Sequence, residues 1–430
     1  MRDGSGWSTP RAVLVTAAPL LALSLVVPQT ATGAASGATP PVSRSVIGEW
    51  MVTAGKAIEA EKGSTGPDES IWLAFVAAGM YNAVVGIEGR YEPYKWPVRG
   101  PRTASSEAAA ATAAHRLLRF WFPKSADASD AAYAASLAKV PDGPAEDEGV
   151  AFGVRAAERI IALRAGDGQG VSVPVASTPR PGTWRPTPPA YEPFASAWLG
   201  RLRPLLLDSP GQFRPGPPPA LASARYAAEI REVRVYGAKK GSRRSQAQTD
   251  TALFFTDLDV QKALQDYADR YRYDIVDTAR LYAAVNTVRA DTVITAWEAK
   301  VHYGTWRPID AIREADSDGN PATLPDPDWE PLLPTPAHPD HLSGHAAIAG
   351  ALTGTLTELF GTSRIELTIT STTARRTRHY RDAHTYDRDA VDARVWAGVH
   401  TRTADQAGND TGRRVAAWAM RRYFRPVAPE

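Results

Sequence analysis

The stretch SGHAAIAGALTGTLTELF, residues 343–360, gives the strongest local indication of the fold. Its serine, Ser343, is suited to cap a helix that runs to about Phe360, because the hydroxyl can accept a hydrogen bond from a free amide of the first turn. The first turn of a helix carries partial positive charge, so the segment predicts a binding site for an anion. His345 stands in that turn, within reach of a bound anion. Taken alone, the segment is better explained as an ordinary cap followed by a surface histidine.

Two further segments bring cations. Lys300 and Arg307 are seven residues apart, or two helical turns, but the proline after Arg307 disfavours helix there and places Arg307 just beyond the helix end. Arg394 and His400 are six residues apart with Gly398 between them, so we expect the helix to break near this glycine. Each pair alone is typical of solvated surface charges.

Together the three segments predict a pocket for a tetrahedral oxyanion such as phosphate. Guanidinium and ammonium groups neutralise its charge, backbone amides at the helix start orient it, and an imidazole can do covalent or proton chemistry. His338 and His341 lie shortly before Ser343, and four imidazoles raise the alternative of a zinc site. Their spacing fits no common zinc pattern, and three cations oppose a divalent metal. The other histidines are expected to be structural or on the surface: His115, His302, His379 and His384.

The composition excludes several classes of protein. The chain has 430 residues and a formal net charge of +2, which predicts no nucleic-acid partner. It has no cysteine, so disulfides and thiolate metal sites are excluded. A chain of this length can hold its core by packing alone.

The N-terminus has the pattern of an export signal. Arg2 and Arg11 precede an apolar run from Ala12 to Val27, and small residues up to Ala35 offer a cleavage site. We therefore expect a signal peptide at 1–34 and a secreted, extracellular protein with no stable membrane insertion after cleavage. The alternative is a retained membrane anchor, but the run is shorter than the roughly 20 residues that a spanning helix needs. No later segment is expected to span a bilayer.

The rest of the chain predicts an all-α fold. After a flexible leader at 35–44, a single helical domain is expected at 45–425, with an N-terminal helical layer and a Pro-rich loop at 45–220 and the catalytic helices at 221–425. The best strand candidate, Ile365–Ile369, is short. We expect the loop to be pinned to the surface by its aromatic residues, which are Trp184, Tyr191, Phe194 and Trp198. Helical periodicity predicts helices near residues 71–85, 108–122, 145–164, 223–235, 245–255, 259–271, 275–303, 343–360 and 403–423.

Further motifs resemble those of a known family. These are Trp297-Glu298-Ala299-Lys300 with Trp306-Arg307-Pro308, Gly398-Val399-His400 followed by Asp405 and Gly408, and Met80-Tyr81-Asn82-Ala83-Val84 with Tyr91-Glu92-Pro93-Tyr94. Together with the pocket, they resemble the vanadium-dependent haloperoxidases and the related type-2 phosphatidic acid phosphatase superfamily. The resemblance runs from about Ser45 to Tyr423 and implies a helical bundle of the vanadium haloperoxidase / acid phosphatase type.

The resemblance also implies roles for the pocket residues, with vanadate as cofactor and phosphate able to occupy the same site. His400 would bond the vanadium atom, and His345 would be the acid–base group. His338 holds a position that influences halide oxidation in some members. The residues that would hold the vanadate oxygens are Lys300, Arg307, Ser343, Gly344 and Arg394.

The chain departs from the family pattern at three positions. His341 and Leu342 precede Ser343, where the family has an aromatic residue and a proline, and Asn82 replaces an aspartate. These departures bear on the halide preference and leave the oxyanion pocket intact.

One pocket can serve two chemistries, because vanadate bound to a histidine is five-coordinate, as phosphorus is midway through phosphoryl transfer. The similarity outside the pocket favours a secreted vanadate-dependent haloperoxidase that acts on hydrogen peroxide and halide. The alternative is an acid phosphatase that hydrolyses a phosphate ester through a phosphohistidine. A third alternative is a non-catalytic oxyanion-binding protein, which two placed imidazoles disfavour. The halide, the organic substrate and the oligomeric state stay open at this point.

Overall fold

The long helix α9 (Ile275–Tyr303) joins the two halves of the chain. It packs against α2 (Glu69–Glu88) on one side and against α11 (Gly344–Phe360) and α13 (Arg402–Met420) on the other. Asp274 caps its start by accepting a hydrogen bond from a first-turn amide, and Gly304 ends it in the left-handed conformation. Almost every residue from 276 to 300 is buried, as expected for a helix surrounded by others.

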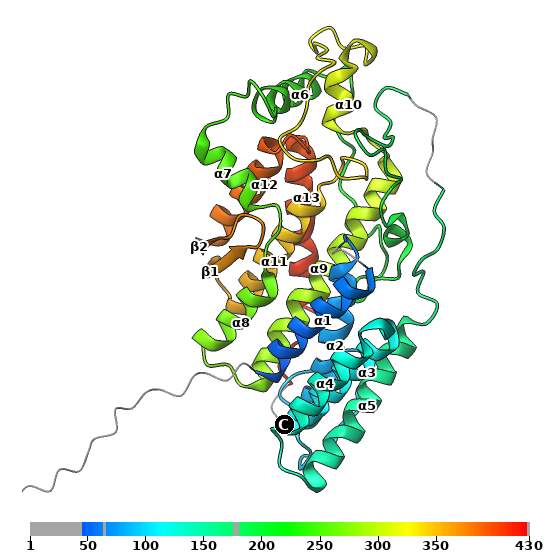
Figure 1. The fold of residues 1–430 in the computed structure, drawn as a ribbon, viewed down its shortest axis with the longest axis vertical. Coiled ribbons are helices and arrows are strands. Elements are labelled where there is room, and N and C mark those ends of the chain that lie inside the picture. The colour runs from blue at the N-terminus through cyan, green and yellow to red at the C-terminus, as the bar shows by residue number, and fades with distance from the viewer. Residues whose placement is uncertain (1–44, 63–65, 175–179, 428–430) are drawn as a thin grey trace, which may run out of the picture. The chain divides into compact units, whose positions relative to one another are not determined.

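The structure is a computed structural model that describes residues 45–62, 66–174 and 180–427. The signal peptide expected at 1–34 and the leader expected at 35–44 lie outside the described residues. The described residues form thirteen α-helices, three short 3-10 helices and one two-stranded sheet, so the prediction of a helical fold is confirmed (Figure 1).

The N-terminal helices form a layer against α9, in which α3, α4 and α5 lie together at one end (Figure 1). Of the described helices, α2 is the one long and apolar enough to cross a membrane, which corrects the expectation that no later segment is. All of its most apolar stretch is buried inside the fold. Besides α2, the helices of this layer are α1 (Val46–Lys62), α3 (Ser106–Trp121), α4 (Ala126–Leu137) and α5 (Pro144–Arg164).

In the C-terminal half, α11 and α13 are in close backbone contact. A side chain at Gly412 would place its Cβ 2.1 Å from the carbonyl oxygen of Ala347, and one at Gly408 would lie 2.5 Å from that of Ser343. Glycine is therefore required at both positions. The close contact fixes the start of α11, where Ser343 lies. The other helices of this half are α6 (Ala224–Tyr236), α7 (Gln246–Phe254), α8 (Val260–Arg270), α10 (Pro308–Arg313) and α12 (Ala383–Trp396).

The small sheet pairs β1 (Arg364–Ser371) with β2 (Arg376–Asp382) as an antiparallel hairpin. The strand expected at Ile365–Ile369 is thus confirmed, and its alternate residues are buried. The sequence does not predict β2, because only Tyr380 among its seven residues is buried and it shows no apolar alternation.

The predicted helices are present within a few residues of their expected ends, but α1, α4, α10 and α12 were not predicted. In the Pro-rich loop, Trp184 is buried and Trp198 packs against the core, as expected. Tyr191 does not pin the loop, because 63% of its surface is exposed. Hydrogen bonds also hold the loop, and the one from the amide of Ala195 to the carbonyl oxygen of Ala337 brings it to the edge of the candidate site.

Candidate active site

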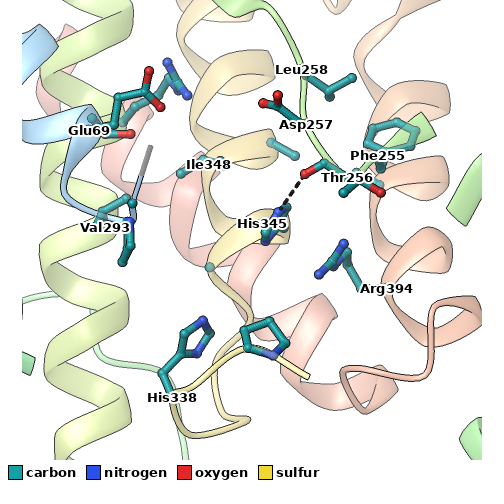
Figure 2. Close-up of a pocket in the computed structure, with 18 of the residues that line it drawn as sticks. Glu69, Phe255, Thr256, Asp257, Leu258, Val293, His338, His345, Ile348 and Arg394 are labelled. Atoms are coloured by element: carbon teal, nitrogen blue, oxygen red, sulfur yellow. Dashed lines mark hydrogen bonds between the residues drawn. The ribbon is translucent and has the colours of Figure 1, made fainter. Parts of the chain in front are cut away.

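A cavity of about 420 Å³ lies among α9, α11 and α12. Figure 2 shows His345 and Arg394 facing the same space, with His338 at one end and Glu69 at the other. His345 comes from the first turn of α11 and Arg394 from the last turn of α12. The start of α11 and the end of α12 therefore place an imidazole and a guanidinium side by side in the cavity lining.

Lys300 and Arg307 are fully buried next to His338, and backbone carbonyls accept hydrogen bonds from both. Lys300 Nζ donates to the carbonyl oxygen of Pro339 at 2.6 Å. Arg307 Nε donates to the carbonyl oxygen of His338 at 2.6 Å, and its Nη1 donates to that of Val399. As predicted, Arg307 follows the end of α9 in extended conformation rather than continuing the helix. The backbone of 338–340 thus positions both cations.

The buried imidazole of His400 is oriented by a carboxylate. Its Nδ1 lies 2.6 Å from Asp340 Oδ1, and Thr401 donates its hydroxyl to Asp340 Oδ2 at 2.7 Å. Burial raises the pKa of Asp340 to about 6, against the opposing effect of Arg307. A proton on Nδ1 leaves Nε2 as the nitrogen with a free lone pair, which is the common arrangement behind a ligating histidine.

Arg307 lies beside the His400 ring. Its Nη1 is 3.3 Å from Nδ1 and 3.2 Å from Nε2. Because these distances are nearly equal, Nη1 is not on the axis along which the Nε2 lone pair points. The lone pair therefore remains available to another atom.

Arg394 contrasts with the other two cations. It is 3% exposed, and its Nε and Nη1 atoms are buried without a hydrogen-bond partner among the described residues. Burial lowers its pKa to about 10, while Asp405 raises it, so the group stays charged at neutral pH. A buried, unsatisfied guanidinium is costly, and its open donors fit an anion.

The start of α11 completes this wall. Ser343 is fully buried and accepts a hydrogen bond from Ala346, as predicted for the cap. A Cβ at Gly344 would come 3.1 Å from the Trp297 ring, so glycine lets the helix start lie close to that ring. Asp405 is fully buried nearby, and burial raises its pKa well above the ordinary range.

The three histidines of the site are held neutral. Arg394, followed by burial, lowers the pKa of His345 to about 3, and His345 Nε2 lies 3.3 Å from the carbonyl oxygen of Thr256. Burial, together with Lys300 and Arg307, holds the pKa of His338 and of His400 well below the usual value. His338 lines the cavity, and its Nδ1 lies 3.1 Å from Arg307 Nη2, so it links the cavity to the buried cations.

The structure thus brings together the residues that the sequence singled out. The glycine break also holds, since Gly398 follows α12 at φ +79° and lets the chain turn back toward His400. Asp340 was missed as a functional residue. Its position two residues after His338 could have indicated it, but nothing in the sequence predicts its contact with His400, which is sixty residues away.

The departures from the family pattern lie at the edge of the site or outside it. His341 Nε2 lies 3.0 Å from the carbonyl oxygen of Gly216, and burial lowers its pKa to about 4. Asn82 exchanges two hydrogen bonds with the backbone of Tyr94 and is not among the described residues that line the cavity. His115, His379 and His384 are outside the cavity lining in the described part of the chain, as expected.

The comparisons with known proteins concern the fold of the chain. The model of the VCPO second helical-bundle domain matches residues 280–429. The crystal structure of a bacterial vanadium-dependent iodoperoxidase superposes with a TM-score of 0.75 at 22% identity, covering 91% of this chain and 99% of that one.

Two structures of a bacterial vanadium-dependent chloroperoxidase also match. The holo form gives a TM-score of 0.67 at 17% identity over 87% of this chain and 96% of that one. The apo form gives 0.67 at 17% identity over 83% of this chain and 94% of that one. No curated protein matches the chain. Residues 280–429 are therefore similar to the VCPO second helical-bundle domain, and the chain has the fold of the bacterial vanadium haloperoxidases.

Proposed function

We propose that this protein is a vanadate-dependent haloperoxidase that uses hydrogen peroxide to oxidise a halide to hypohalous acid. The observation that carries the proposal is Arg394, a buried cation with open donors beside His345, in a chain with the haloperoxidase fold. A protein that needed only a stable core would not keep such a charge unpaired. The pocket is therefore suited to an anion.

The residues present fit vanadate. Three buried cations offset its negative charge, and Arg394 has two open donors for its oxygens. His400 would bond the vanadium atom through Nε2. When bound, vanadate would activate hydrogen peroxide toward attack by halide. The groups that would surround the anion are Lys300, Arg307, Ser343, Gly344 and Arg394, and Lys300 and Arg307 would contribute mainly their charge because carbonyls accept their hydrogen bonds.

Asp340 keeps His400 in the required tautomer. Its carboxylate accepts a hydrogen bond from Nδ1–H, so Nε2 carries the lone pair that would make the bond. Arg307 stands beside the ring and balances negative charge without blocking that lone pair. The role is one of positioning, because Asp340 itself is turned toward His400 and Thr401.

His345 can move a proton at the edge of the anion site. Its Nε2 faces the Thr256 carbonyl and is suited to donate, which leaves Nδ1 to exchange protons with a ligand. Arg394 keeps the ring neutral while the site holds no anion. A bound anion offsets that positive charge and raises the pKa of His345 toward the working range of an acid–base catalyst.

The test is halogenation of a phenol dye by hydrogen peroxide. The protein is purified without phosphate and assayed with iodide, bromide and chloride, with and without orthovanadate. We expect halogenation that depends on vanadate. Hydrolysis of p-nitrophenyl phosphate is measured in parallel, and phosphate-ester turnover without halogenation at any halide would replace this proposal with the phosphatase.

The matched control is His384→Ala. His384 is an exposed histidine on α12 that does not line the cavity. The variant should keep the wild-type halogenation rate. A loss as large as that in a pocket variant would mean that the assay reports general damage to the fold.

We also propose that the protein is secreted. The proposal rests on the charged and apolar pattern of residues 1–34. Mass spectrometry of the protein from the culture medium should find a mature chain that begins near Ala35. A chain that retains Ala12 to Val27 in the membrane fraction would show an anchor instead.

A further inference from the structure

A second buried cation that makes no hydrogen bond or ion pair with a described residue lies at the far end of the same cavity. Arg289 on α9 lines the cavity and is 8% exposed. Its Nη1 atom is buried, and Arg289 makes no hydrogen bond or ion pair with any described residue. It belongs to none of the three sequence segments that form the oxyanion pocket.

Between the two ends, the sides of the cavity that α9 and α11 form are mainly apolar, while Thr256 and Asp257 line a further side (Figure 2). Val293 and Trp297 follow Arg289 at intervals of four residues and so share one face of α9. Opposite them, Ile348 and Leu352 follow His345 along α11. Arg289 and Trp297 are eight residues apart on α9, so about 12 Å of helix separates the two ends of the cavity on this side.

Glu69 of α2 also lines this end of the cavity (Figure 2), and its carboxyl group interacts electrostatically with Arg289. No ion pair within 4.0 Å joins the two among the described residues. Burial raises the pKa of Glu69, and the nearby charge of Arg289 opposes that rise. Arg289 thus keeps its donors open even though a carboxylic acid lies near.

We propose that this end of the cavity binds the carboxylate of an organic substrate. The apolar, aromatic body of that substrate lies between α9 and α11 and presents its ring to the oxyanion end near His345. A guanidinium favours a carboxylate because its two parallel donors match the two oxygens. The binding site stands on Arg289 and the apolar wall, whereas the reaction of the ligand rests on the proposed haloperoxidase function.

A carboxylate on a flexible phenol tests the binding step without vanadate or peroxide. The probe is 4-(4-hydroxyphenyl)butanoate, compared with its neutral amide and with 4-(4-hydroxyphenyl)butylamine, all measured by titration calorimetry. We expect the carboxylate to bind at least about tenfold more tightly than the amide, as the loss of a charge-assisted hydrogen bond implies. The amine should bind most weakly.

Variants assign the preference to Arg289. Arg289→Gln should remove the difference between carboxylate and amide, and Glu69→Gln should strengthen carboxylate binding because it removes a neighbouring acid. Arg388→Gln, a change of the same kind at an exposed arginine of α12, should leave both affinities unchanged. Thermal unfolding shows whether each variant is folded.

Three results would overturn the proposal. They are equal affinity of the wild type for carboxylate and amide, a preference for the amine, and a folded Arg289→Gln variant that still prefers the carboxylate. Halogenation is scored separately with unsubstituted phenol. If phenol is not halogenated but the binding differences hold, the haloperoxidase proposal fails and the carboxylate site stands.

Discussion

The two sides of the oxyanion site differ in how their cations are held. On one side, the backbone of 338–340 and the carbonyl of Val399 accept hydrogen bonds from Lys300 and Arg307. On the other, Arg394 has open donors and His345 makes one long contact to a carbonyl. On the first side the protein itself accepts the hydrogen bonds of the cations, whereas on the second side donors remain without an acceptor.

This difference separates positioning from binding. A cation whose donors are taken up by carbonyls contributes charge from a fixed place and supports the protein fold. A cation with open donors contributes little to the fold and can direct its hydrogen bonds to an anion. Substitutions on the two sides should therefore affect different measured quantities.

The largest expected effect follows from His400→Ala, which removes the one side chain proposed to bond the central atom. We expect halogenation to fall to the background rate, while vanadate still binds weakly through the cations. Steady-state kinetics and vanadate titration measure the two effects. Wild-type turnover in this variant would show that His400 does not bond the cofactor.

The next test weakens the positioning side without removing His400. Asp340→Asn keeps the size of the side chain but loses the charge that holds the Nδ1 proton. We expect vanadate affinity or turnover to fall about 10- to 100-fold, as for other carboxylates behind a ligating histidine. Unchanged affinity and turnover would mean that the contact between Asp340 and His400 has no functional role.

The two arginines give the most direct test of the comparison. Lysine keeps the charge but lacks the planar fork of donors. Arg394→Lys should reduce vanadate affinity by about 1.5 kcal/mol, roughly tenfold, with little change in the free energy of unfolding. Arg307→Lys should in addition lower the free energy of unfolding by about 1–3 kcal/mol, because it leaves buried carbonyls without donors.

Titration calorimetry and urea unfolding separate these outcomes. The comparison fails if Arg394→Lys destabilises the protein as much as Arg307→Lys does. It also fails if neither variant loses vanadate affinity, because both arginines would then have no contact with the anion.

The smallest expected effect concerns pH. The unfolded chain takes up a proton at histidine near pH 6.5, whereas folded His345 does so only near pH 3. Between these values the unfolded state binds more protons, so His345 makes the protein less stable as the pH falls from 7 to 5. His345→Gln should reduce this loss by about 1–2 kcal/mol.

Urea unfolding at pH 7 and pH 5, without phosphate or vanadate, measures this change. The control is His384→Gln at an exposed histidine, which should follow the wild type. The same pH dependence in wild type and His345→Gln would show that Arg394 does not suppress the charge of His345.

The sequence predicts site residues that constrain the local backbone better than residues whose role depends on contacts distant in the chain. Ser343, Gly398 and the proline after Arg307 are local signals, because each constrains the backbone where it stands, and the structure agrees at all three. Asp340 and Arg289 were missed because an acid in a loop and an arginine in a buried helix have no local signature. Their roles follow only from contacts with residues far away in the sequence.

The missed elements have a similar cause. Helix α12 begins after β2, and neither has the clear apolar period that predicts a buried face. Each depends on packing against segments far away in the chain. The prediction of an all-α fold therefore succeeded through long, buried helices such as α9 and α11.

The carbonyls that hold Lys300 and Arg307 limit how this site can be transplanted. A designer who copied only the three charged segments onto another helical scaffold would leave out the backbone of residues 336–340, which accepts the hydrogen bonds of both cations. Their side chains would then be free to rotate and to pair with solvent. A successful graft has to carry that uncharged loop as part of the catalytic unit.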